Sequence, residues 1–483
     1  MALGEFARRW LPAIVLGVAA FALWNGAERR DTDIVSTEPI EYELELVTPM
    51  LSARRVPRTL QAPVVDAKLA PTLRAMISDS PTNTCLLVQL GDREIGPSSR
   101  VGAGLVPASN QKIISTYGAY LGLGADFRYT TAVVTDAAVT DGVLNGNLYF
   151  VGSGDPFLST DDWWTQYEET DGRFHTRLED LADAIAATGI VEVTGSVIGD
   201  ESLLDAERQG LWAERLINDR QSGPLSALTV NEGFNDWPEA YVAARLRSST
   251  EDPPVHAASV LSQLLAERGV TITGPAAAGI APAGAEPVAT VSSPPLIDLL
   301  THINSYSSNL GAELVLKRLG LEQTGEGTTR AGADAVRALI AADGVPVDRL
   351  VIDDGSGLAE SNRLTCRAIA AVLVNAEPGS DFASTLAIGG ERGTLRLRMV
   401  DTPAEGNVMA KSGTLNGVKA LSGYAASTSD GDVELVFAYI ANGEYIGNDE
   451  EITDLQDTFA ASLTDYPGAP SVGDLSPFPP VPS

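Results

Sequence analysis

Three short runs of residues carry side chains that together suit acyl-transfer chemistry. They are Ser109-Asn110-Gln111-Lys112, Ser307-Ser308-Asn309 and Lys411-Ser412-Gly413-Thr414. The first run supplies a hydroxyl nucleophile and an amine, the second supplies another hydroxyl and an amide, and the third supplies a cation beside glycine and threonine. The chain has only five lysines, and Lys112 alone has a serine three residues before it. Each run by itself is only weak evidence of function, but the three runs together and in this order predict one composite site.

Ser109 and Lys112 have the spacing of a nucleophile and its base. A serine hydroxyl is a poor nucleophile at neutral pH and needs a neighbouring base. Because residues three apart lie on one helical face, a helix that begins near Ser109 places both side chains together. Burial or a second cation lowers the pKa of a lysine, and Lys411 is the candidate for that cation. The helix N-terminus also offers N–H groups to an oxyanion. The alternative is an N-capping serine followed by a surface lysine.

Ser307 and Asn309 precede a run with helical character, from Gly311 to Leu319. The Ser307 hydroxyl is a candidate for relaying a proton between the lysine and a leaving amine, and the Asn309 amide is a candidate for holding a substrate amide. The alternative is a helix N-cap cluster, because serine and asparagine are favoured at that position.

The third run lies in a segment with strand character, from Asn407 to Leu415. On an edge strand, Gly413 would let a substrate backbone approach and pair in β-fashion. Lys411 with the Ser412 and Thr414 hydroxyls would then hold a terminal carboxylate. The alternative is a charged edge-strand residue that prevents aggregation.

Composition limits the classes of partner. The 483 residues carry a net charge of −31, which argues against nucleic acid as a partner. The three histidines (175, 256 and 302) form no H-E-x-x-H or comparable cluster, so we expect neither a metal site nor a cofactor. No serine lies in a G-x-S-x-G run, the motif that would accompany the nucleophile of a Ser-His-Asp triad in an α/β-hydrolase.

The two cysteines, Cys85 and Cys366, are too few for a disulfide framework. The sequence leaves open whether they pair or stay unpaired and buried.

The N-terminus has the pattern of an export segment. Arg8 and Arg9 precede an uncharged stretch over residues 10–27. A positive start and an apolar core describe a signal peptide or signal anchor, and we favour an uncleaved anchor with the bulk of the protein outside the membrane. Residues 28–56 are polar and suit a tether, and residues 467–483 suit a loose tail.

Periodicity predicts a catalytic domain interrupted by an insertion. Strands are expected at residues 85–90, 193–198, 408–415, 421–427 and 433–440, and helices over 111–123, 177–188, 294–313 and 332–341. The Ala/Pro/Gly stretch from Gly274 to Pro287 is expected to be a boundary loop. The resulting domain boundaries are 57–130 and 290–466 for the two parts of the catalytic domain, with 131–289 inserted between them.

The chain resembles the class C low-molecular-mass penicillin-binding proteins, the D-alanyl-D-alanine carboxypeptidase/endopeptidase family (peptidase family S13). The S-x-x-K, S-x-N and K-[ST]-G runs carry the resemblance. It extends to Val151-Gly-Ser-Gly-Asp-Pro, Pro224-Leu-Ser-Ala-Leu-Thr-Val-Asn231, Asp354-Gly-Ser-Gly-Leu and Ser361-Asn-Arg-Leu-Thr365. One departure is Ser412, where threonine is commoner, but the hydroxyl is kept.

The resemblance implies an α+β fold: a transpeptidase-like (serine β-lactamase-like) domain with an antiparallel sheet covered by helices, interrupted by a large strand-rich insertion. It also implies residue roles. Ser109 would be acylated, Lys112 would be its base and Ser307 would relay protons. Asn309, Lys411, Ser412, Gly413 and Thr414 would bind substrate, with the backbone N–H groups of Ser109 and Thr414 as the oxyanion hole.

The implied function is that of a serine DD-peptidase of the extracytoplasmic cell envelope. Its substrates would be peptidoglycan stem peptides, cleaved at D-Ala-D-Ala or at D-Ala cross-links through an acyl-enzyme, and β-lactams would be covalent inhibitors. A serine β-lactamase remains an alternative, although no E-x-x-L-N run follows Ser307. So does a catalytically silent protein that binds the wall or senses β-lactams.

Overall fold

The computed structural model describes residues 16–22, 57–219, 221–236, 249–431 and 433–468. Most of the predicted N-terminal anchor, the tether over 28–56 and nearly all of the tail lie outside these residues. Residues 16–22 are helical, and no helix in the described ranges has the length and apolar character needed to cross a membrane. The chain from Thr59 onward forms one compact unit, which contains all three of the predicted runs.

A six-stranded antiparallel sheet forms the centre of this unit, in the order β14-β15-β16-β17-β1-β2. Its strands are β1 (Asn83–Leu90), β2 (Arg93–Glu94), β14 (Ala387–Ile388), β15 (Val408–Leu415), β16 (Val418–Ala426) and β17 (Glu434–Asn442). The N-terminal β1 pairs with the C-terminal β17 over seven residue pairs, from Asn83↔Asn442 to Gln89↔Val436. The two ends of the catalytic region therefore close one sheet.

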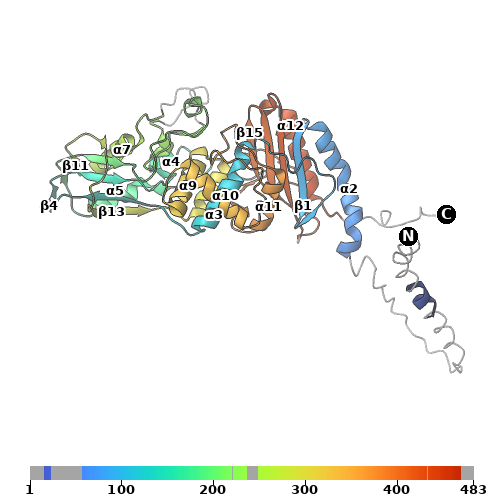
Figure 1. The fold of residues 1–483 in the computed structure, drawn as a ribbon. Coiled ribbons are helices and arrows are strands. Elements are labelled where there is room, and N and C mark those ends of the chain that lie inside the picture. The colour runs from blue at the N-terminus through green and yellow to red at the C-terminus, as the bar shows by residue number, and fades with distance from the viewer. Residues whose placement is uncertain (1–15, 23–56, 220, 237–248, 432, 469–483) are drawn as a thin grey trace, which may run out of the picture. The chain divides into compact units, whose positions relative to one another are not determined.

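Side chains alternate between the two faces of the sheet, and each face is covered by helices (Figure 1). From β17, Val436, Ala438 and Ile440 pack into one core, whereas Phe437 and Tyr439 pack into the other. The first core is closed by α3 (Gln111–Leu123), α10 (Thr329–Ala342) and α11 (Cys366–Ala376). The second is closed by α2 (Pro57–Asp79), α12 (Glu450–Thr464) and the 3₁₀ turn η5 (Gly393–Leu395).

The helix that carries Lys112 is central to a helical layer beside the sheet. α3 packs against α10, α8 (Leu296–Tyr306) and α9 (Asn309–Thr324). Nine of the thirteen residues of α3 are buried, including the polar Gln111, Lys112 and Thr116. A helix buried on nearly all sides fixes its side chains firmly, which suits a residue that must be held in place.

A third core lies between residues 130 and 292. Its main sheet has the order β12-β10-β6-β3-β13 and packs against α5 (Leu178–Ala186) and α7 (Pro253–Glu267). The strands are β3 (Thr130–Thr135), β6 (Leu148–Val151), β10 (Val197–Asp200), β12 (Ala277–Ala278) and β13 (Glu286–Ser292). The first and last of these pair with each other, Thr130 opposite Ser292, so the chain enters and leaves this region at one place.

Smaller elements complete the fold. A four-stranded sheet has the order β11-β9-β5-β4, and β7 pairs with β8. The remaining bounds are β4 (Val139–Thr140), β5 (Val143–Leu144), β7 (Leu158–Ser159), α4 (Asp161–Trp164), β8 (Thr176–Arg177), β9 (Glu192–Val193), α6 (Arg215–Asn218), η2 (Asn231–Gly233), β11 (Thr271–Ile272), η1 (Ala108–Asn110), η4 (Ala383–Thr385) and η6 (Ile446–Asn448).

The predicted α+β class with a helix-covered antiparallel sheet is confirmed, and several local predictions need correction. The stretch from Gly274 to Pro287 is not simply a loop: it contains β12 and the start of β13. Ala277 and Ala278 pair with Ile198 and Gly199, so sheet pairing overrides a composition that favours turns. The helix expected over 294–313 is two helices, broken where Ser307 adopts φ +61°. The domain boundaries at 131 and 289 stay a prediction.

The two cysteines form a disulfide. Cys85 of β1 bonds to Cys366 at the start of α11, across 281 positions of sequence, and both residues are fully buried in the first core. The bond ties the sheet to a helix that covers it. The sequence left this pairing open because no local spacing indicates it.

Candidate active site

Ser109 lies on a tight turn at the start of α3. The turn is η1, and the preceding Ala108 has φ +47°, a conformation that residues with a β-carbon adopt rarely. Gly357 permits the turn: it has φ +87°, and a β-carbon there would lie 1.9 Å from the Ala108 carbonyl oxygen. Strained backbone of this kind persists where the surroundings determine it, and it concentrates at functional sites. Ser109 does not cap α3, whose N-cap residue is Asn110.

Lys112 is fully buried one helical turn later, so the alternative of a surface lysine is wrong. Its Nζ donates to Ser109 Oγ at 3.2 Å, to Asn309 Oδ1 at 2.5 Å and to the Ser356 carbonyl at 2.7 Å. Burial lowers the pKa of Lys112 to about 7, although the charges of Asp354 and Glu313 oppose the shift. A substantial fraction of this amine is therefore neutral at physiological pH and able to accept the Ser109 proton.

Two buried carboxyl groups hold the loop that carries Ser356. Glu313 of α9 accepts hydrogen bonds from the backbone N–H groups of Gly355 and Ser356, at 3.1 and 3.0 Å. Asp354 accepts hydrogen bonds from Gly357 N–H, Ala359 N–H and Asn362 Nδ2. Burial raises the pKa of both carboxyl groups, to about 7 for Glu313. This arrangement aims the Ser356 carbonyl at Lys112.

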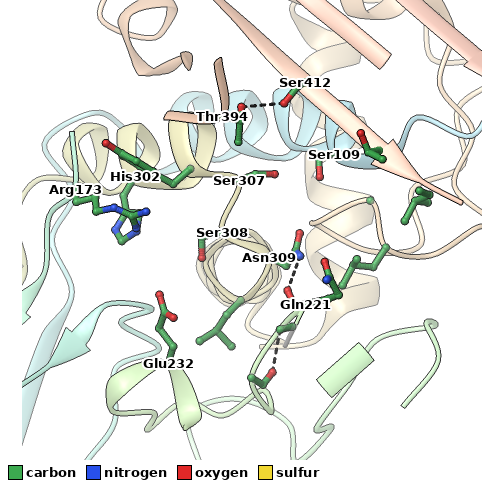
Figure 2. Close-up of a pocket in the computed structure, with 18 of the residues that line it drawn as sticks. Ser109, Arg173, Gln221, Glu232, His302, Ser307, Ser308, Asn309, Thr394 and Ser412 are labelled. Atoms are coloured by element: carbon green, nitrogen blue, oxygen red, sulfur yellow. Dashed lines mark hydrogen bonds between the residues drawn. The ribbon is translucent and has the colours of Figure 1, made fainter. Parts of the chain in front are cut away.

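Ser307 and Ser308 are adjacent but differ in structural role. Ser308 Oγ accepts a hydrogen bond from Gly311 N at 3.1 Å and caps α9, so the cap predicted for this cluster exists at Ser308. Ser307 is the left-handed residue that ends α8, and its side chain lines the cavity (Figure 2). The Ser307 hydroxyl is not used for capping in the described structure.

Asn309 joins the nucleophile region to the strand-rich region. Its Oδ1 accepts from Lys112, and its Nδ2 donates to the Gln221 carbonyl (Figure 2). Because Lys112 carries only donors when it is protonated, the amide oxygen must face it and the amide nitrogen must point away. Asn309 thus fixes Lys112 from the side opposite α3.

The third predicted run lies on β15 beside the turn of Ser109. β14 pairs only with Met409 and Ala410, so in the described structure no strand covers the outer edge of β15 from Lys411 to Leu415. Ser412 Oγ donates to Thr394 Oγ1 at 2.9 Å, and Thr414 is exposed. The uncovered edge is a place where an extended chain can add as a strand.

Lys411 and Gly413 lie below the surface of the site. Lys411 is fully buried, and its Nζ donates to the Ser412 carbonyl at 3.0 Å. Burial first, and then the charge of Lys112, lower the pKa of Lys411 well below its ordinary value. A β-carbon on Gly413 would lie 3.0 Å from the Pro107 carbonyl oxygen and 3.1 Å from Asn110 Nδ2. Gly413 therefore makes room for the turn before Ser109.

A cavity of about 460 Å³ brings most of the predicted residues together. Of the predicted residues, Ser109, Ser307, Asn309 and Ser412 line it (Figure 2), and so does Thr414. Lys112, Lys411 and Gly413 lie behind this lining. Among the described residues, no group of three or more His, Cys, Asp or Glu is placed to hold a metal ion.

The sequence did not single out several residues that shape this site. Glu313, Asp354 and Ser356 orient Lys112 from 200 or more positions away, so no local pattern reveals them. Asp354 and Ser356 belong to a segment that supported the family resemblance, but their function was not inferred. On the other side of the cavity, the missed lining residues are Tyr167, Arg173, Glu232, His302 and Tyr306.

Comparison with known proteins shows that the chain is similar to enzymes of one family. Residues 96–237 and 236–465 match the D-Ala-D-Ala carboxypeptidase 3 (S13) family. A D-alanyl-D-alanine carboxypeptidase of Actinomadura sp. (strain R39) is 28% identical over 442 residues, covering 76% of this chain and 78% of that protein. The carboxypeptidase DacB of Mycolicibacterium smegmatis is 28% identical over 461 residues, covering 89% and 91%.

Solved structures agree with the fold. The crystal structure of penicillin binding protein 4 (dacB) from Haemophilus influenzae superposes with a TM-score of 0.66 at 20% identity. The match covers 81% of this chain and 98% of that one. The chain therefore shares the fold of that structure over most of its length.

Proposed function

The chain belongs to the D-Ala-D-Ala carboxypeptidase 3 (S13) family and is a serine-type DD-peptidase, and we propose the following roles for its residues. Ser109 Oγ attacks the carbonyl carbon of the penultimate D-alanine of a peptidoglycan stem peptide. Neutral Lys112 accepts the hydroxyl proton as the new C–O bond forms. The backbone N–H groups of Ser109 and Thr414 stabilise the oxyanion.

The leaving amine needs a proton before the C–N bond breaks. Ser307 is free of a capping role and lines the cavity with Ser109, so it is suited to pass the proton from Lys112 to that nitrogen. The acyl-enzyme is then hydrolysed by water, with the lysine acting again as the base. The same steps release D-alanine from a D-Ala-D-Ala end or a peptide amine from a D-Ala cross-link.

The carboxylate beyond the scissile bond is assigned to the β15 edge. Ser412 and Thr414 offer hydroxyl groups from the cavity wall, and Lys411 lies just behind them. An anion bound there stabilises the protonated form of Lys411 and so raises its pKa. The acyl part of the substrate runs along the uncovered edge toward Leu415, while Asn309 contacts its amide.

One observation carries this proposal: a fully buried lysine with a pKa of about 7 donates to the hydroxyl of Ser109. Such a buried base next to a half-buried serine is costly, and a protein that only binds the wall has no use for it. A β-lactam sensor would need the base for acylation but would release no D-alanine. A β-lactamase would share the acylation machinery and would differ in fast hydrolysis of the penicilloyl ester, so the lifetime of the adduct separates the two.

Intact-mass analysis after brief exposure to benzylpenicillin tests the proposal, followed by a D-alanine release assay. We expect one stable adduct on the Ser109 peptide and release of D-alanine from a D-Ala-D-Ala peptide. The Ser109→Ala variant should form no adduct, whereas the buried control Ser153→Ala should still form it. An adduct on Ser109→Ala would overturn the nucleophile assignment, and rapid drug hydrolysis without an adduct would favour the β-lactamase.

The enzyme is assigned to the cell envelope outside the cytoplasm, where peptidoglycan lies and where a disulfide such as Cys85–Cys366 persists. The apolar residues 10–27 are proposed to hold the full chain at the membrane. Carbonate extraction of membranes from expressing cells tests this point: an anchored chain stays with the membrane, and a cleaved or peripheral chain is released.

A further inference from the structure

Arg173 brings a guanidinium group into the cavity between two tyrosine rings. Its Cζ lies 4.0 Å from the ring centre of Tyr167 and 3.6 Å from that of Tyr306. All three residues line the cavity that also contains Ser109 and Ser307. Stacking on both faces immobilises the guanidinium plane and leaves its edge as the direction for hydrogen bonding.

The contacts of Arg173 leave its charge without a counterion. Nη1 lies 3.0 Å from His302 Nε2, while His302 Nδ1 lies 3.3 Å from the Phe174 carbonyl. Because a carbonyl only accepts, Nδ1 is the donor and Nε2 accepts from the guanidinium, so His302 is neutral. Within the described ranges no carboxylate forms an ion pair with Arg173, and its Nε has no partner.

This lack of a counterion is notable in a chain of net charge −31. The carboxylate of Glu232 lines the same cavity, but it accepts a hydrogen bond from the Tyr167 hydroxyl at 2.7 Å. Nε is buried and Nη1 contacts His302, so Nη2 is the nitrogen that remains to donate a charge-assisted hydrogen bond to a carboxylate in the cavity.

The segment before Arg173 contacts η5, which in turn contacts Ser412 of β15. Glu169 accepts from Gly393 N at 3.2 Å and pairs with Arg396 at 2.9 Å, on either side of Thr394. Thr394 in turn accepts from Ser412. In Figure 2, Ser307 lies between Arg173 and Ser109, and Thr394 lies on the side of Ser412 that faces Arg173. Arg173 is therefore beyond Ser412, away from the end of the edge that leads to Leu415.

We propose that Arg173 forms an anion subsite for the leaving peptide of a cross-linked substrate. The inference rests on the proposed function, in which Ser412 and Thr414 hold the carboxylate next to the scissile bond and the acyl part extends toward Leu415. When the leaving group is D-alanine, it has no atoms beyond that carboxylate. When the leaving group is the amine of a second, cross-linked peptide, that peptide extends past Ser412, and an additional carboxylate on it reaches Arg173.

Two synthetic substrates with the same acyl half test the subsite. Both release a short peptide amine, whose distal group is a carboxylate in one substrate and a carboxamide in the other. We expect the wild-type protein to favour the carboxylate about tenfold in kcat/KM, the size expected for one charged hydrogen-bonded pair. In Arg173→Gln the ratio should fall to about one, and Arg173→Lys should retain part of it.

Arg330→Gln is the matched control, because Arg330 is an exposed cation on α10 that pairs with Asp334 and does not line the cavity. It should keep the wild-type ratio. No preference in the wild-type protein, or an unchanged ratio in Arg173→Gln, would overturn the subsite while penicillin acylation of Ser109 leaves the proposed function standing. Absence of both the penicillin adduct and turnover would remove the proposed function and the subsite with it.

Discussion

Glu313 fixes the carbonyl acceptor of Lys112 through the backbone of Ser356. The Glu313 carboxyl group accepts from Ser356 N at 3.0 Å, and the Ser356 carbonyl accepts from Lys112 Nζ at 2.7 Å. Both side chains are fully buried, so the two contacts act where water does not screen them. Burial lowers the pKa of Lys112, and the charge of Glu313, which does not line the cavity, opposes that shift.

The first prediction concerns the pH dependence of acylation. Because the pKa of Lys112 is lowered to about 7, its neutral form increases as pH rises through 7. The second-order rate of acylation by a fluorescent penicillin should rise about tenfold per pH unit below pH 6 and level off above about pH 8. A lysine of ordinary pKa would instead give a rise that continues to pH 10. Circular dichroism at each pH verifies that the fold is intact.

The second prediction is that Glu313→Gln moves this profile. The variant removes a negative charge that favours protonated Lys112 and disturbs the loop that presents the Ser356 carbonyl. Both changes disfavour the ammonium form, so the midpoint of the profile should move to lower pH. Because a glutamine amide nitrogen cannot accept from a backbone N–H, the variant should also unfold about 1–3 kcal/mol more easily.

Glu322→Gln is the control for that experiment, because Glu322 lies on the same helix at the surface and pairs with Arg318. Its pH profile should match that of the wild-type protein. If Glu313→Gln only lowers stability and leaves the midpoint in place, the carboxyl group has a structural role and does not tune Lys112.

The sequence could single out candidates whose residue types the proposed chemistry restricts. Ser109, Lys112 and Ser307 are such candidates, because the proposed catalysis restricts their types and the helix restricts the spacing of the first two. The residues that orient them could not be found in this way. Glu313 and Ser356 interact through one backbone N–H, and Arg173 acquires its environment from rings that are distant in sequence.

Some of the errors in the predicted fold have a similar origin. Ala277 and Ala278 form a strand only because β10 pairs with them, and α7 and α12 were missed although each has an acidic N-cap, Asp252 and Asp449. The close contact of Gly413 with the Ser109 turn was also not foreseen, because Pro107 and Asn110 are about 300 positions away in the sequence. Contacts distant in sequence decided β12 and Gly413, whereas α7 and α12 carry local N-cap signals.

The third prediction separates two neighbouring serines. Ser308→Ala removes the α9 cap and should lower the free energy of unfolding by about 1 kcal/mol. Ser307→Ala keeps the cap and should reduce kcat for D-alanine release by about 10²-fold or more, with little change in stability. Urea melts and steady-state kinetics on both variants check this. If both variants lose kcat to the same extent, turnover depends on the backbone conformation between α8 and α9 and not on the Ser307 hydroxyl.

The fourth prediction concerns the disulfide between Cys85 and Cys366. The bond restricts the unfolded chain across 281 positions, and for so long a loop its removal should cost about 2–5 kcal/mol. We expect the double variant Cys85→Ala/Cys366→Ala to unfold at a lower urea concentration. Its native state should still be acylated by benzylpenicillin, because neither cysteine lines the cavity.

Reductant provides the internal check on that prediction. Dithiothreitol in the urea melt should lower the midpoint of the wild-type protein, since the bond becomes accessible as the chain unfolds, and should leave the double variant unchanged. A shift of equal size in both proteins would show that the reductant acts elsewhere. Alkylation of two thiols in the native, unreduced protein would show that the bond is not formed. If acylation is also lost in a folded double variant, the bond positions α11 and the Ser109 turn beyond its effect on stability.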